Sequence, residues 1–122
     1  MIGHGEPPYL ECSSAGDSRF SAFGAYVLGK NIEAHYQGAK VFADGSTGLS
    51  WREAKGKRAV NIDEVAELYF QLWEFYLSDK PHLYKVLATA TGLSDRFGKP
   101  GHQCQATVLW ELRRRYLEKQ HA

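Results

Sequence analysis

The chain of 122 residues is 43% hydrophobic and 24% charged, a composition typical of one soluble globular domain with its own core. Fifteen basic and fourteen acidic residues give a net charge of +1, which argues against a strong, non-specific nucleic-acid binder. Two widely separated cysteines and the lack of a long apolar run predict a cytoplasmic protein without disulfides or membrane contact.

The N-terminal third is predicted to hold short strands followed by one helix. Residues 1–19 are rich in Gly, Pro and Ser, so regular structure there should be brief. Asn31 is a suitable N-cap for the helix, and the glycines that follow Ala43 should end it. The elements expected here are strands at 9–12 and 25–28, a turn at 29–31 and a helix from Ile32 to about Phe42.

Helices dominate the rest of the chain. Ser50–Glu53 has the form of a capping box, and Asn61–Glu64 is a second start signal of this kind. Apolar residues then recur at helical spacing. The expected elements are helices from Ser50 to about Gly56, from Asn61 to about Ser78, from Pro81 to Gly92 as the C′ residue, and from about Gln103 to Lys119, with a loop at 93–101 and a Glu111–Arg115 pair on the last helix. The predicted fold is mainly α (α+β at most), one compact domain over 1–122 with about five helices and a small N-terminal strand pair.

Four polar side chains share one face of the helix predicted at 32–42. At positions i, i+3, i+4 and i+7 stand Glu33, Tyr36, Gln37 and Lys40. A carboxylate held near a cation and hydrogen-bonding neighbours is suited to acid–base chemistry on a small polar substrate. The alternative is that Glu33 is an ordinary acidic residue of a first helical turn, where the helix dipole favours a negative charge.

Other kinds of site have little support. The histidines and cysteines show no HExxH, CxxC or facial-triad spacing, so we expect no metal and no other cofactor. Nucleophile elbows and phosphate-binding glycine loops are absent. The remaining polar candidates are Glu11, Asp17, Arg19, Asp95, Arg96 and the cluster Lys55, Lys57 and Arg58. The alternatives are a surface role for Arg19, a loop-stabilising role for Asp95 and a solvated charge cluster at 55–58.

The segment Glu33–Lys40, EAHYQGAK, has the pattern Glu-x-x-Tyr-Gln-x-x-Lys and resembles the EHYFQAQK signature of the NADAR (YbiA-like) family of N-glycosidases. Further segments match in the same order: 20–23 is similar to FSNF, 54–57 to A-x-x-G-R, 95–98 to D-x-x-W-G and 109–113 to L-M-E-L-R. The chain departs from the family at Ala22, which replaces Asn, at Phe97, which replaces or shifts the loop Trp, and at 103–106.

This resemblance implies a small, mainly helical protein that hydrolyses a ribose C1–nitrogen bond in an ADP-ribosyl or ribosylamino nucleotide. The resemblance implies that Glu33 is the key carboxylate, that Lys40 keeps it ionised and that Asp95 assists at the ribose or leaving group. The base would be walled by Phe20, Phe23 and Phe97, and the substrate would be positioned by Tyr36 and Gln37. Phosphate would be bound by Arg19 and Lys55, and Gln103 would also contact the substrate.

Two alternatives to catalysis stay open. A non-catalytic protein could use the same pocket to sequester a nucleotide or ADP-ribose derivative, and an oligomeric interaction protein would use the aromatic residues without any ligand. The partners expected are therefore a nucleotide-like ligand or ADP-ribosylated base, and a second copy in a homo-oligomer. The segment GHGEPPYLECSS followed by RFSAF also resembles small phage-encoded proteins, which would function in the host cytoplasm.

Overall fold

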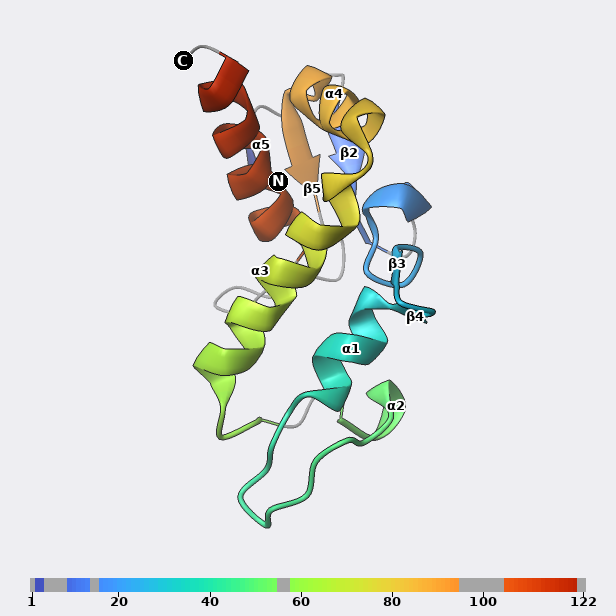
Figure 1. Ribbon diagram of the computed structural model, residues 1–122, viewed down its shortest axis with the longest axis vertical. Helices are drawn as coiled ribbons and strands as arrows, with labels where there is room; N and C mark the ends of the chain where they lie inside the picture. The colour runs from blue at the N-terminus through green and yellow to red at the C-terminus, as the bar shows by residue number, and fades with distance from the viewer. Residues whose placement is uncertain (1, 4–8, 14–15, 55–57, 95–104, 121–122) are drawn as a thin grey trace.

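Five α-helices carry most of the described part of the chain. The computed structural model describes residues 2–3, 9–13, 16–54, 58–94 and 105–120. The helices are α1 (Ile32–Gly38), α2 (Trp51–Ala54), α3 (Ile62–Ser78), α4 (Pro81–Thr89) and α5 (Gln105–Gln120). The strands are β1 (Ile2–Gly3), β2 (Tyr9–Glu11), β3 (Tyr26–Val27), β4 (Lys30–Asn31) and β5 (Gly92–Ser94), with a 3-10 turn, η1, at Ser18–Phe20. The fold is mainly α with small strand pairs, which confirms the predicted class (Figure 1).

Helix α3 is the central element. Its 17 residues run between α4 and α5 at one end of the molecule and α1 at the other (Figure 1). Its inward face follows the predicted helical spacing, and Trp73 and Leu77 are fully buried with Leu109 of α5. None of the helices in the described ranges has the length and apolar character needed to span a bilayer.

The strands predicted at 9–12 and 25–28 are present as β2 and β3, but they lie in different sheets. In the main sheet β5 lies between β1 and β2, antiparallel to β1 and parallel to β2. The sequence predicted Gly92 as a helix C′ residue and 93–94 as loop, and this was wrong. Ala90 ends α4 in an extended conformation, so the chain enters β5 two residues later.

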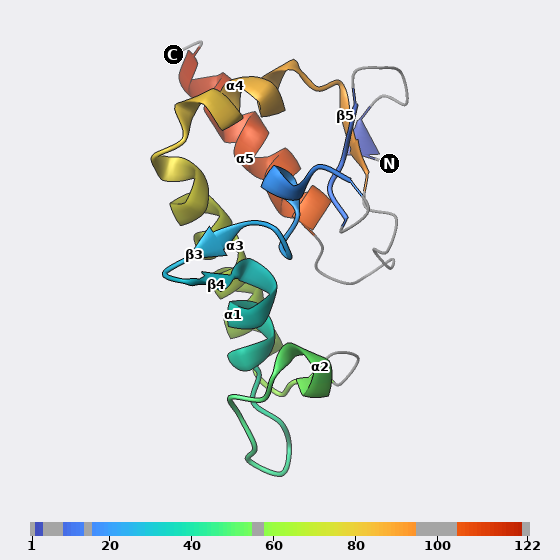
Figure 2. The same ribbon diagram turned by 90° about the vertical axis from the view of Figure 1, so that its right-hand side faces the viewer.

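A second small sheet is the β3–β4 hairpin, which leads directly into α1 (Figure 2). The predicted turn at 29–31 is displaced by one residue, since the loop is Leu28–Gly29 and both residues have positive φ, 51° and 85°. Two positive φ values match the right-handed twist of the flanking strands. Glycine adopts such a φ without strain, whereas a leucine does not. Leu28 is also 87% exposed, so packing gives it no compensation.

We expect Leu28→Asn to stabilise the protein by about 0.5–1 kcal/mol, because Asn tolerates positive φ far better than Leu. Urea unfolding measures the change. Leu28→Ala is the matched control, since it removes the exposed apolar side chain but keeps an unfavourable Cβ. Equal stability of the Asn and Ala variants would show that the backbone at this turn is not strained.

Helix α1 ends at Gly38 rather than at the predicted Phe42. Ala39 N still donates to His35 O at 3.1 Å, but Lys40 N donates to Gln37 O at 3.3 Å, a bond one residue shorter in range. Val41 N instead donates to the side-chain Oδ1 of Asn61 at 2.9 Å, and Asn61 Nδ2 donates to Ala39 O at 3.0 Å. Asn61 was predicted as a start signal for α3, and α3 does begin at Ile62, but the Asn61 side chain makes no capping bond there. It joins the end of α1 to the start of α3.

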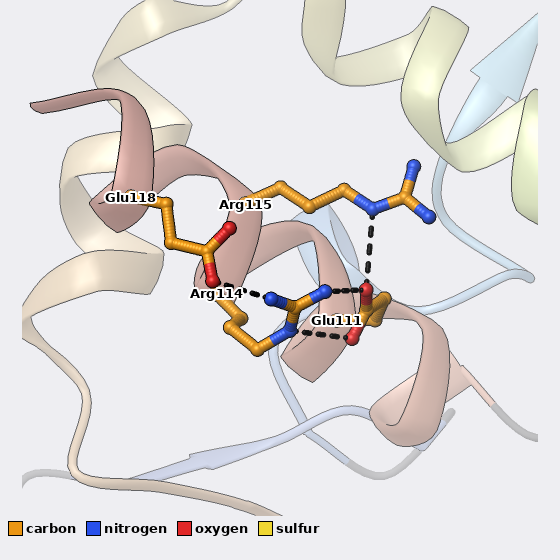
Figure 3. Close-up of polar contacts among 4 residues, drawn as sticks. All are labelled: Glu111, Arg114, Arg115 and Glu118. Atoms are coloured by element: carbon orange, nitrogen blue, oxygen red, sulfur yellow. Dashed lines mark hydrogen bonds and ion pairs between the residues drawn. The ribbon is translucent and has the colours of Figure 1, made fainter. Parts of the chain in front are cut away.

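The exposed face of α5 carries the charge network shown in Figure 3. The predicted i, i+4 pair is confirmed, because Arg115 Nε donates to Glu111 Oε1 at 3.2 Å. Arg114 binds the same carboxylate, with Nε 3.0 Å from Glu111 Oε2, and also contacts Glu118. The Arg114 hydrogen bond is the main reason that the pKa of Glu111 falls to about 2.

Glu111→Gln should therefore change how stability depends on pH. A carboxyl whose folded pKa is lowered contributes stability above its ordinary value of 4.5, and loses it as pH falls toward about 2. For a solvent-exposed network the contribution is only about 0.5 kcal/mol. Urea unfolding should show wild type more stable near neutral pH and the two proteins converging in acid. Glu74→Gln controls for loss of one exposed carboxylate, and a wild-type advantage that persists at the lowest pH would contradict the assignment.

Candidate functional site

Glu33 lies in the first turn of α1 and is half-buried. The turn is fixed by Asn31, whose Oδ1 accepts the Ala34 N–H at 2.8 Å, as the sequence predicts for an N-cap. The backbone N–H of Glu33 donates to Ala22 O at 3.0 Å. The carboxylate is thus positioned on an anchored backbone, and the start of a helix favours its negative charge.

Gln37 holds the Glu33 carboxylate from one turn further along. Its Nε2 donates to Glu33 Oε1 at 2.8 Å, in the i, i+4 relation expected from the spacing. Gln37 is only 5% exposed, and its Oε1 is buried without a hydrogen-bond partner among the described residues. The Glu33 bond fixes the amide orientation, because the flipped amide would place two acceptor oxygens against each other. A buried acceptor therefore remains beside the carboxylate.

Lys40 stands beyond the end of α1, so the fourth member of the predicted stripe is not helical. Its side chain nevertheless returns to the same region, with Nζ 5.3 Å from the centre of the Tyr36 ring. Lys40 is 8% exposed. This burial lowers the pKa of Lys40, and the negative charge of Glu33 opposes the shift. The charge of Glu33 therefore acts on Lys40.

Tyr36 belongs to the protein interior more than to a ligand surface. Its ring packs against Tyr69 of α3 with centroids 4.8 Å apart and planes tilted by 53°. Burial, and secondarily the Glu33 charge, raise the pKa of Tyr36, so its hydroxyl stays protonated at neutral pH. Tyr36 supports the site by packing α1 on α3.

Gln105, at the start of α5, was not among the predicted site residues. Its Oε1 accepts hydrogen bonds from Tyr69 Oη at 3.2 Å and from Ala22 N at 3.4 Å. The Ala22 peptide therefore lies between Gln105 and Glu33 N, and joins the first turns of α1 and α5. The only sequence signal was an amide side chain directly before the buried apolar residues of α5.

Two of the predicted binding residues from η1 have other partners. Arg19 donates from Nε and Nη2 to the two carboxylate oxygens of Asp17 at 3.0 and 2.7 Å. This bidentate bond lowers the pKa of Asp17 and neutralises the charge that was expected to bind phosphate. Phe20 is fully buried, so its ring packs in the core and does not wall a ligand as predicted.

Phe23 is half-buried, and its role in walling the base stays a prediction. Its carbonyl accepts from Asn31 Nδ2 at 3.3 Å, which places it next to the N-cap of the Glu33 helix. The remaining predicted site residues lie outside the described part of the chain: Lys55, Asp95, Phe97 and Gln103.

Glu33 does not line either of two surface cavities formed by described residues. One, of about 410 Å³, lies between α3 and α5 and is lined by Glu67, Phe70 and Arg115 among others. The other, of about 530 Å³, borders α1 on the side of His35 and Gly38. Within the same ranges, no group of three His, Cys, Asp or Glu side chains could hold a metal ion.

No protein-family model matches the chain, and no curated protein matches it. The relationship to the NADAR family therefore stays a prediction, carried by the motifs around Glu33–Lys40. The geometry itself contributes a half-buried carboxylate that an amide holds by a hydrogen bond, and whose charge acts on a buried lysine.

Proposed function

We propose that the protein is an N-glycosidase that hydrolyses a ribose C1–nitrogen bond in an ADP-ribosyl or ribosylamino nucleotide, with Glu33 as the key carboxylate. The observation that carries the proposal is the 2.8 Å bond from Gln37 Nε2 to Glu33 Oε1. It fixes one carboxylate oxygen in a half-buried position and leaves the other for chemistry. The motif resemblance supports the same residue.

The reaction needs a negative charge close to the anomeric carbon. As the C1–N bond breaks, its electron pair leaves with the base, and positive charge develops on the ribose. A positioned carboxylate stabilises this oxocarbenium-like state, and can accept a proton from the water that adds to C1. Lys40 contributes a buried positive charge near this site, while Asp95 is proposed to assist the departing nitrogen.

Substrate binding is assigned to rings and amides near the carboxylate. Phe23 would contact the base together with Phe97, and Gln37 would position the Glu33 carboxylate through its amide. Lys55 would bind phosphate. Arg19 would bind the phosphate as well only if its guanidinium released Asp17, with which it forms an ion pair.

A second candidate function is binding without turnover. It is favoured by Ala22, which is fully buried where the related signature has an asparagine. The only polar groups of Ala22 are those of its backbone, and both form hydrogen bonds. Its N–H donates to Gln105 Oε1, and its carbonyl accepts from Glu33 N. A side chain that could contact substrate is therefore replaced by a methyl group, while the carboxylate is kept. Such a protein would sequester an ADP-ribose-like nucleotide.

Incubation with N-ribosides distinguishes the two functions. The substrates are ADP-ribosylated nucleobases and ribosylamino-pyrimidine phosphates, with base release followed by chromatography and mass, and binding followed by calorimetry. Released base supports the glycosidase. Saturable binding without release supports sequestration. Neither release nor binding would overturn both assignments of the Glu33 site.

A further inference from the structure

The cavity of about 530 Å³ beside α1 is separate from the Glu33 site. Side chains on an α-helix advance by about 100° per residue, so His35 and Gly38 project from the face opposite to Glu33 and Gln37. The cavity is closed by three further segments, which bring Lys30 from β4, Leu49 from the 48–50 segment and Leu68 from α3. A volume of this size suits a small molecule.

The backbone around the cavity is held in place. Gly48 N donates to Gly38 O at 3.1 Å, which fastens the 48–50 segment to α1. Gly48 has a φ of 70°, a conformation that favours glycine. A Cβ at Gly38 would stand 3.8 Å from Leu49 O, in ordinary contact. The wall is thus preformed, which lowers the entropy lost when a ligand binds.

The charged and titratable groups of the cavity favour an anion. Lys30 is exposed on β4 and has no ion pair within the described residues. His35 Nε2 lies 2.6 Å from Val27 O, and since a carbonyl only accepts, Nε2 carries a proton and the ring has a fixed orientation. Ser50 at the rim donates to Glu53 Oε1 at 2.9 Å, so its proton is engaged. Recognition of a charged group therefore falls to Lys30.

The apolar part of the cavity lining indicates the chemistry of the rest of the ligand, beyond its anionic group. Leu49 and Leu68 are half-buried, and both face the cavity together with Ala34 and Ala39. Among the described residues the lining holds no Phe, Tyr or Trp ring on which a nucleobase could stack, and its aliphatic side chains accommodate an alkyl chain. We infer that this cavity binds a small amphipathic anion, whose carboxylate or phosphate contacts Lys30 and whose aliphatic part lies against Leu49 and Leu68.

The test follows two-dimensional ¹H–¹⁵N spectra of the full chain during titration with hexanoate, hexyl phosphate and uncharged hexanamide. We expect saturable shifts of the Gly38, Gly48 and Leu49 amides with the anions, and much weaker effects with hexanamide. Comparison of hexanoate with hexyl phosphate identifies the preferred headgroup. Lys30→Met should weaken binding of the anions about tenfold, since it removes a charge-assisted contact.

Lys85→Met is the matched control, because Lys85 is an exposed lysine of α4 away from the cavity. It should leave the anion affinity unchanged. The inference is overturned if no saturable shift occurs at these amides, if hexanamide binds as well as hexanoate, or if Lys30→Met binds as tightly as wild type. Because the cavity lies on the other face of α1, each outcome is independent of turnover at Glu33.

Discussion

Glu33→Gln is expected to lower turnover of the N-riboside by about 10²–10³-fold, the usual effect of removing one electrostatic contact to a transition state. Binding should change little. The amide has the shape of the carboxylate, and its oxygen can still accept the Gln37 N–H that now lies at 2.8 Å. Only the negative charge is lost, and this charge matters most when the ribose becomes positive. Rate and affinity are measured separately, by single-turnover base release and by calorimetry.

The chain contains its own control for this substitution. Glu67 and Gln71 on α3 form the same i, i+4 pair, with Gln71 Nε2 3.1 Å from Glu67 Oε1, but on an exposed surface. Glu67→Gln changes the same charge and the same type of hydrogen bond, and should leave turnover at the wild-type rate. Equal losses in both variants, or wild-type turnover in Glu33→Gln, would remove Glu33 from the mechanism.

Phe20→Ala should lose about 3–5 kcal/mol of unfolding free energy, the range for truncating a fully buried aromatic side chain. The ring is among the largest fully buried side chains and belongs to the main core cluster. Its removal creates a cavity that the surrounding residues fill only in part. Denaturant unfolding measures the loss.

Two further variants separate packing from ligand contact. Phe20→Leu keeps most of the buried volume and should lose much less unfolding free energy than Phe20→Ala. Phe75→Ala removes a ring that is 60% exposed and should change the unfolding free energy by about 0.5 kcal/mol or less. A Phe20→Ala protein that keeps full stability but loses ligand affinity would restore the earlier assignment of this ring to the base pocket.

The helices could be predicted well because their signals are local. Residues 62–78 repeat apolar side chains at helical spacing, and the structure confirms this helix with the same limits. The end of α1 could not be predicted, because the Asn61 side chain that takes the Val41 N–H lies 20 residues further along the chain. Strand β5 escaped prediction for a related reason: its three residues become a strand only by pairing with β1 and β2.

The same distinction applies to the candidate site. The contact of Glu33 with Gln37 depends on helical spacing alone, and the sequence predicts it. The burial of Phe20 and the bonds of Gln105 to Tyr69 and Ala22 depend on how separate elements pack. A sequence pattern identifies polar residues that share a face, but tertiary packing decides which of the neighbouring rings remain accessible.

The segment between α1 and α2 is closed at its base by two backbone contacts of its own. Gly48 N donates to Gly38 O at 3.1 Å and Val41 pairs with Thr47, so the excursion that extends furthest in Figure 1 leaves and rejoins the protein at nearly the same place. Lengthening such a closed excursion costs little, about 0.6 kcal/mol for each doubling of its length. Gly45, exposed at its tip, is therefore the natural position to insert a peptide tag or reporter sequence without moving α1 or α3.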